Sequence, residues 1–289
     1  MKIYLSLFAP VIALFFFSCH KNIERVPTPP PAKIDAKSIL NVSYGTSPLQ
    51  NMDVYLPADR STSSTKVLVM IHGGEWESGN KTELNNYVDT MKKRFPDYAV
   101  FNINYRLSIN GNNVFPAQEN DTKAALQFII NNVANYIIST KIVLLGVSAG
   151  GHLALLQAYK YNSPVVPKAV ISFYGPTDLT ELYNDPTSPL IPPALALIVG
   201  NTPAQDPSLY SNSSPINFDS STSPPTLLFH GGLDSLVKPS QAVSLQMKLQ
   251  ANGAINQYVF YPNEDHGWTG ATLSDSFNKI QSFLAANVK

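Results

Sequence analysis

Ser148 is the residue of this chain with the clearest chemical potential. It lies in the sequence GVSAG at 146–150. This sequence follows the apolar run Ile142–Leu145 and precedes Leu153–Leu156, where a helical pattern of apolar residues begins. The apolar run predicts a buried strand of a parallel sheet. The small residues beside Ser148 let the backbone turn tightly from strand to helix and present the hydroxyl to solvent. We therefore predict that Ser148 is a nucleophile.

A serine hydroxyl needs a neighbouring base, and that base needs an acid to orient it. His266 lies on a late loop behind the apolar strand Tyr258–Tyr261, and we predict that it is the base. Asp234 follows the apolar strand 226–230 and a glycine turn, which places it at the carboxyl edge of the sheet, where catalytic groups gather. The resulting order along the chain, serine then acid then base, is that of hydrolases with such a serine turn.

Other polar residues compete for these roles. Asp178 also follows an apolar strand and is the alternative acid. We favour Asp234 because Asp178 would more naturally cap a helix that begins at Leu179. Asp265 is interpreted as a solvated loop charge, and His152 as a packed residue that hydrogen-bonds locally.

An acyl-transfer site also needs backbone donors for the oxyanion of the tetrahedral intermediate. The apolar strand Val67–Ile71 runs into a His-Gly-Gly turn at 72–74, and such a turn exposes backbone N–H groups near the serine turn. We predict that the donors are the N–H groups of Gly74, Glu75 and Ala149.

These residues together resemble the α/β-hydrolase superfamily, and within it the bacterial esterases and lipases with an H-G-G-x-W oxyanion loop, which include feruloyl and acetylxylan esterases. The resemblance covers nearly all of the chain after residue 38. It implies an α/β fold with a mostly parallel central sheet flanked by helices on both faces. Many relatives carry glycine where this chain has Glu75, whose side chain either narrows the approach to the oxyanion site or points into solvent. Further shared motifs are NMDVYLP at 51–57, NYRL at 104–107, FPAQ at 115–118, GGHLA at 150–154 and FYGPTD at 173–178.

Composition and patterning favour one catalytic domain at 38–289. Basic and acidic residues balance at 20 each without a charge run, so nucleic acid is not an expected partner, because phosphate binding needs a clustered basic face. Predicted strands alternate with helical stretches at 120–133 and 240–252, which indicates βαβ units. The Pro-, Ser- and Asn-rich segment at about 179–225 is expected to add a small helix and loops above the site. An open cleft is expected because no long segment before Asp53 could fold into a helical cap.

The first residues predict export. The basic start Met1–Lys2 and the apolar run Ile3–Phe17 form a signal peptide at 1–18 that is too short to span a membrane as a stable helix. It ends before Cys19, the only cysteine, in a pattern that resembles a bacterial lipoprotein processing box. We expect a lipid on Cys19 to anchor the protein in the outer membrane, with 19–37 as a Pro-rich linker. An ordinary signal peptide with an incidental cysteine is the alternative.

The expected function is that of a serine carboxylesterase that needs no cofactor and no metal. The resemblance implies a substrate with short acyl or aryl esters on a carbohydrate. Trp76, beside the oxyanion loop, is either a stacking surface for that substrate or a packed residue. A lipase for longer acyl esters and a peptidase like prolyl oligopeptidase are the enzymatic alternatives, and a surface binding module on an inactive hydrolase scaffold is the third.

Overall fold

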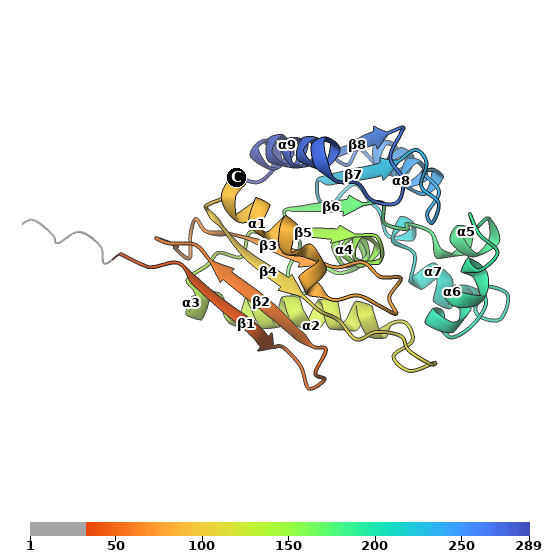
Figure 1. Cartoon of the computed structure of the whole chain (residues 1–289), viewed down its shortest axis with the longest axis horizontal. Helices are drawn as coiled ribbons and strands as arrows, with labels where there is room; N and C mark the ends of the chain where they lie inside the picture. The colour runs from red at the N-terminus through yellow and green to blue at the C-terminus, as the bar shows by residue number, and fades with distance from the viewer. Residues whose placement is uncertain (1–32) are drawn as a thin grey trace, which may run out of the picture. The chain divides into compact units, whose positions relative to one another are not determined.

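The computed structural model describes residues 33–289, so the predicted signal peptide and Cys19 lie outside the described residues. One sheet of eight strands has the order β1-β2-β4-β3-β5-β6-β7-β8, and Figure 1 shows these strands side by side across the molecule. The strands from β3 to β8 are parallel to one another, whereas β2 runs antiparallel to both β1 and β4. The bounds are β1 (Lys37–Ser43), β2 (Asn51–Leu56), β3 (Lys66–Ile71), β4 (Tyr98–Ile103), β5 (Ile142–Val147), β6 (Ala169–Phe173), β7 (Thr226–Gly231) and β8 (Asn256–Tyr261).

Helices cover both faces of the sheet, which confirms the predicted fold class. Side chains of α1 and α9 pack on one face, and those of α2, α4 and α8 pack on the other. Strand β3 serves both layers, since Val67 and Val69 face one cluster while Leu68 and Met70 face the other. A strand buried on both faces reads as a continuous apolar run, which is why its sequence was recognisable. The bounds are α1 (Asn85–Arg94), α2 (Ala117–Asn131), α3 (Val133–Tyr136), α4 (Ala149–Lys160), α8 (Ser240–Ala251) and α9 (Gly270–Asn287), with a 3₁₀ turn η1 (Lys81–Leu84).

The segment 179–225 holds more helix than its composition suggested. The expectation of one small helix was wrong: the segment forms α5 (Leu179–Asn184), α6 (Ile191–Val199), α7 (Pro207–Asn212) and the 3₁₀ turn η2 (Pro215–Asn217). The polar and proline residues that suggested loops begin these helices. Asp178 caps α5, Asp206 caps α7, and prolines occupy the first turns of α6 and α7.

The helices α5, α6 and α7 gather at one end of the molecule, towards which the arrowheads of β5, β6 and β7 point (Figure 1). The structure thus places the inserted helices at the sheet edge where the candidate site residues lie.

Within residues 33–289, no helix combines the length and the apolar composition needed to cross a bilayer.

Candidate active site

Ser148 occupies a strained turn between β5 and α4. Its φ of 54° and ψ of −121° lie outside the regions that residues with a side chain favour. A Cβ atom at Gly146 would lie 2.0 Å from the carbonyl oxygen of Gly150, so the turn closes only with glycine there. The N–H of Ser148 donates to the carbonyl oxygen of Phe173 at 2.8 Å, which ties the turn to β6.

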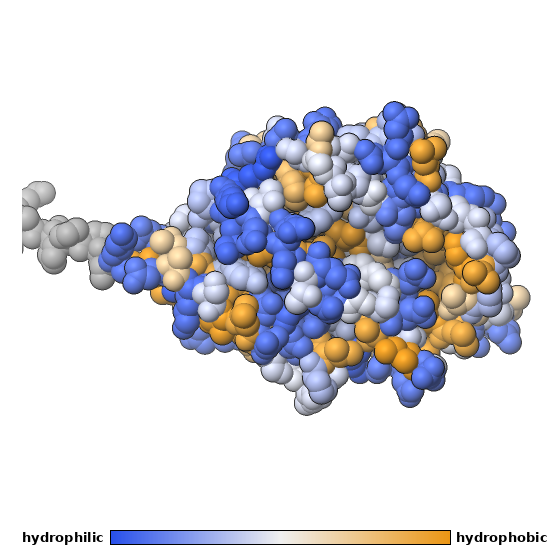
Figure 2. Space-filling view, viewed as in Figure 1, coloured by the Kyte–Doolittle hydropathy of each residue, from blue (hydrophilic) through white to orange (hydrophobic). Residues whose placement is uncertain are grey.

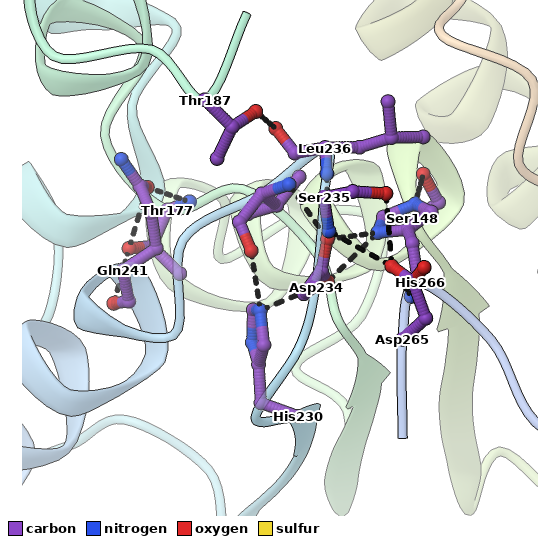
Figure 3. Close-up of polar contacts among 11 residues, drawn as sticks. Ser148, Thr177, Thr187, His230, Asp234, Ser235, Leu236, Gln241, Asp265 and His266 are labelled. Carbon is purple, nitrogen blue, oxygen red and sulfur yellow. Dashed lines mark hydrogen bonds and ion pairs between the residues drawn. The ribbon is translucent and has the colours of Figure 1, made fainter. Parts of the chain in front are cut away.

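The structure brings together the three side chains that the sequence predicted as nucleophile, base and acid. The Nε2 atom of His266 lies 2.8 Å from the Oγ of Ser148, and its Nδ1 atom lies 2.8 and 2.9 Å from the two carboxylate oxygens of Asp234. Figure 3 shows the continuous chain of contacts. Because Nδ1 faces a carboxylate, it carries the proton and leaves Nε2 free to accept the proton of the serine hydroxyl.

Asp234 is a buried carboxylate with several donors. Its Oδ1 atom accepts hydrogen bonds from the N–H groups of Leu236 and Val237 at 2.9 and 2.8 Å. Burial raises the pKa of this carboxyl, but hydrogen bonds from His230, His266 and the N–H of Val237, with charge attraction from His266, hold the pKa well below its usual range. The group is therefore ionised at neutral pH.

The competing acid has another task. Asp178 accepts hydrogen bonds from the N–H groups of Thr180 and Glu181 at 2.8 and 3.1 Å, so it caps α5 as expected.

Asp265 does more than the sequence suggested. It is exposed, as expected of a solvated charge. However, its Oδ1 atom accepts from the N–H and Oγ of Ser235 at 2.8 and 2.9 Å and from the N–H of His266 at 2.7 Å. The side chain thus ties the loop that carries Asp234 to the loop that carries His266.

The oxyanion loop follows β3 in a left-handed conformation. Gly74, Glu75 and Trp76 have φ values of 98°, 56° and 61°. Among the hydrogen bonds of residues 33–289, none uses the N–H groups of Gly74, Glu75 or Ala149. A Cβ atom at Gly73 would lie 3.2 Å from the Cβ of Ser148, so this loop runs directly past the serine.

Glu75 and Trp76 lie differently in this loop. Glu75 is exposed at the rim of the pocket beside Ser148, in line with a side chain that points into solvent. Trp76 is only 4% exposed, and its ring packs edge-on against Phe115 and His152. Its packed interpretation holds, although one side of the residue still lines the pocket.

His152 is packed, as predicted, but its hydrogen bonds reach residues that are distant in the sequence rather than local ones. Its Nδ1 atom accepts from the indole N–H of Trp76 at 3.3 Å, and its Nε2 atom donates to the carbonyl oxygen of Ser213 at 2.7 Å. Ser213 belongs to the inserted segment, so His152 connects the oxyanion loop to it. A second histidine, His72, stacks on Tyr105 and donates to the carbonyl oxygen of Gly73. Both histidines therefore hold residues of the oxyanion loop through hydrogen bonds.

An apolar pocket opens beside Ser148 and His266. Its void is about 480 Å³, counted out to the open mouth. The inserted helices α5 and α6 supply much of the wall, and Figure 2 shows apolar side chains over this end of the molecule. The apolar lining residues are Trp76, Ala149, Pro176, Leu182, Ile191, Ala194, Leu195, Ile198, Leu236 and Val237.

The apolar wall that α5 and α6 give the pocket is not among the features predicted from the sequence. The recurrence of apolar residues from Ile191 to Ile198 at helical spacing was the available signal, but nothing in it indicated the direction that the helix would face. Within residues 33–289, no three His, Cys, Asp or Glu side chains cluster as metal ligands would.

A protein-family model described as BD-FAE matches residues 52–249, more than half of the chain. The chain belongs to this family. Esterase LipC of Mycobacterium tuberculosis is 26% identical over 259 residues, which cover 84% of this chain and 64% of LipC. The probable carboxylic ester hydrolase LipM of the same organism is 32% identical over 216 residues, which cover 70% of this chain and 49% of LipM. The chain thus spans about half to two thirds of the length of these curated relatives.

Solved structures give the same fold. A truncated carbohydrate esterase from gut microbiota superposes with a TM-score of 0.74 at 26% identity, covering 89% of this chain and 99% of that one. A bifunctional GH43-CE protein of Bacteroides eggerthii superposes with a TM-score of 0.76 at 28% identity, covering 87% of this chain and 35% of that one. The BD-FAE domain therefore has an α/β-hydrolase fold.

The lowered pKa values of His72 and His152 predict that the free energy of unfolding depends on pH. Burial lowers the pKa of His72 and His152 from about 6.5 to about 4. Between these values the unfolded chain binds protons that the folded chain does not, so the free energy of unfolding should fall as the pH falls from 6.5 to 4. Each histidine contributes up to about 1.4 kcal/mol per pH unit. Asp234, with its lowered pKa, adds acid sensitivity only below this window.

Urea unfolding measured from pH 4 to pH 8 tests this prediction. In His152→Gln, one of these titrating groups is gone, and the slope between pH 6.5 and pH 4 should be smaller than that of the wild type by up to about 1.4 kcal/mol per pH unit. Equal slopes in the two proteins would contradict it.

Proposed function

We propose that this protein is a serine carboxylesterase that cleaves esters of an apolar acyl or aryl group carried on a carbohydrate. The observation that carries the proposal is the hydrogen-bond chain from Ser148 through His266 to Asp234, with 2.8 Å at each link, beside an apolar pocket. The esterases among its relatives support ester hydrolysis as the reaction.

The mechanism is a two-step acyl transfer. The Oγ of Ser148 attacks the ester carbonyl while Nε2 of His266 accepts its proton. Asp234 holds the imidazole in the required tautomer and stabilises the imidazolium. The backbone N–H groups of Glu75 and Ala149, with that of Gly74, stabilise the oxyanion of the tetrahedral intermediate. His266 then protonates the leaving alcohol, and a water activated by the same imidazole releases the acid from Ser148.

Substitutions in the triad test this mechanism. Ser148→Ala should abolish turnover of p-nitrophenyl acetate, and Asp234→Asn should lower kcat by about 10,000-fold because the histidine takes the wrong tautomer. Asp178→Asn is the matched control, because asparagine still caps α5 and should keep the wild-type kcat. Steady-state kinetics, with circular dichroism to verify folding and mass spectrometry to map a fluorophosphonate label to Ser148, provide the readout. A nearly silent Asp234→Asn beside a crippled Asp178→Asn would reverse the assignment of the acid.

The acyl group is proposed to enter the apolar pocket. The polar residues of that pocket are Ser148, His266 and the rim residue Glu75. Its apolar walls favour an aryl or aliphatic acyl group over acetate, because each buried methylene gains free energy on leaving water. The carbohydrate as the alcohol part rests on similarity to two solved structures, a carbohydrate esterase and a bifunctional GH43-CE protein.

Filling the pocket should change acyl selectivity. In Ala194→Trp, a large ring occupies the pocket, and kcat/KM for p-nitrophenyl butyrate and methyl ferulate should fall roughly tenfold or more, while that for acetate changes little. Leu197→Trp is the control, because this residue of α6 is 68% exposed and does not line the pocket.

The same substrate panel separates the alternatives. A wild-type maximum at eight or more carbons with activation at an oil–water interface would favour a lipase, and preferential cleavage of a peptide amide panel would favour a peptidase. An acetate rate that falls together with the butyrate and ferulate rates in Ala194→Trp would contradict the proposed acyl pocket.

We further propose that Cys19 is lipidated and anchors the protein in the outer membrane, on the basis of the sequence around it. Mass spectrometry of the N-terminal peptide of the mature protein should find a lipid-modified cysteine, and Cys19→Ala should lose membrane association. A mature chain with an unmodified Cys19 would disprove the anchor.

A further inference from the structure

A third histidine lies behind the candidate triad. His230 is the penultimate residue of β7, four residues before Asp234, and both side chains are fully buried. Its Nε2 atom lies 3.1 Å from Oδ2 of Asp234 and 2.8 Å from the carbonyl oxygen of Val237. Figure 3 shows His230 reaching the carboxylate from the side opposite His266.

The two neighbours of His230 Nε2 determine its protonation. Both the carboxylate of Asp234 and the carbonyl of Val237 are acceptors, so Nε2 must carry a proton and donate it to both. The other ring nitrogen, Nδ1, is buried and has no hydrogen-bond partner among residues 33–289. A proton on Nδ1 would be a buried donor without a partner, which is unfavourable. The neighbours of His230 therefore favour the tautomer with the proton on Nε2.

His230 completes the set of donors around Asp234. Oδ1 accepts from the N–H groups of Leu236 and Val237, Oδ2 accepts from His230, and Nδ1 of His266 lies within 2.9 Å of both oxygens. Without His230, His266 would be the one remaining donor to Oδ2 among residues 33–289, and the orientation of the carboxylate would be held less firmly. The bond from His230 to Val237 also holds the loop 234–237 against the end of β7.

We propose that His230 is a positioning residue for the acid of the triad: it orients the Asp234 carboxylate towards His266 and takes up part of its negative charge. This inference rests on the proposed function of Ser148, His266 and Asp234. In a buried site, a carboxylate that shares its charge with a second donor attracts the imidazolium less strongly. His230 thereby sets the basicity of His266 as well as its orientation.

The other ionisable groups near this cluster are few. Tyr174, at the end of β6, packs against the ring of His266 at 4.5 Å, and burial raises the pKa of its hydroxyl well above the usual value, so it stays neutral. Asp265 holds the backbone of His266 and is ionised, because hydrogen bonds from His266 and Ser235 lower its pKa. Glu75 lines the same pocket as His266. All of these groups remain in place in the His230 variants, so they are common to the wild type and the variants.

Two substitutions separate the positioning role from a packing role. His230→Leu fills the space without a donor, whereas His230→Gln retains an N–H near the position of Nε2. In His230→Leu, kcat per active site titrated with a fluorophosphonate should fall roughly ten- to a hundredfold with KM nearly unchanged. The acid limb of its kcat/KM profile should move up by roughly half a pH unit or more, because the carboxylate attracts the imidazolium more strongly. His230→Gln should restore both quantities to near wild-type values.

Active-site titration removes any contribution from unfolded protein. Wild-type kcat and an unshifted pH profile in His230→Leu, with only a loss of stability, would overturn the proposal.

Nuclear magnetic resonance gives a readout that needs no turnover. In the wild type at pH 7, nitrogen-15 shifts of His230 should report a protonated Nε2 and a bare Nδ1, and a protonated Nδ1 would overturn the proposal even if His230→Leu does not fold. The resonance of the proton between His266 and Asp234 should shift in His230→Leu and remain in His230→Gln. Absence of turnover and of fluorophosphonate labelling in the wild type would instead refute the proposed function, while these spectra would still test the contact.

Discussion

The start of α4 lies against the end of β3 with no room for a side chain between them. A Cβ atom at Gly150 would lie 2.1 Å from the carbonyl oxygen of Ile71. This contact holds the oxyanion loop, which leaves β3, beside the nucleophile turn, which leaves β5. Since the strained φ of Ser148 persists only where its surroundings hold it, the close packing of these three elements is the condition for the site.

The buried charge of Asp234 sets the second constraint. An ionised carboxylate is costly to bury without donors, and this one receives hydrogen bonds from two backbone N–H groups and two histidines. The donors come from β7, from the loop behind it and from the loop behind β8. Asp265 links the same two loops from the solvent side. Satisfying the carboxylate therefore also brings the base into place.

The inserted helices shape the pocket beside the candidate triad. They supply an apolar wall to the pocket, and they are coupled to the oxyanion loop through His152, which bonds Trp76 on one side and Ser213 on the other. A shift of the insertion would thus reach both the pocket and the support of the oxyanion donors.

The sequence by itself determined the elements whose signals are local. Ser148 is predicted by its place between a buried strand and a helix, in a turn of small residues. The oxyanion loop is predicted by a His-Gly-Gly turn that follows another strand. Asp234 and His266 followed from their place behind late strands, and the cap at Asp178 followed from its residue type. These features depend on periodicity and on turn chemistry within a few residues, so the chain displays them directly.

Only the tertiary structure decided which side chains meet across long stretches of chain. The link from Asp265 to Ser235, the packing of Trp76 on His152 and the facing of α6 into the pocket join residues that no local pattern relates. His230 is the clearest case. His230 is close to Asp234 in sequence, but its position indicates only the end of an apolar strand. The loop after β7 bends so that Asp234 contacts the imidazole of His230, and this bend depends on how β7 and β8 pack. Contacts of this kind arise from the packing of distant elements, and for that reason the sequence alone did not reveal them.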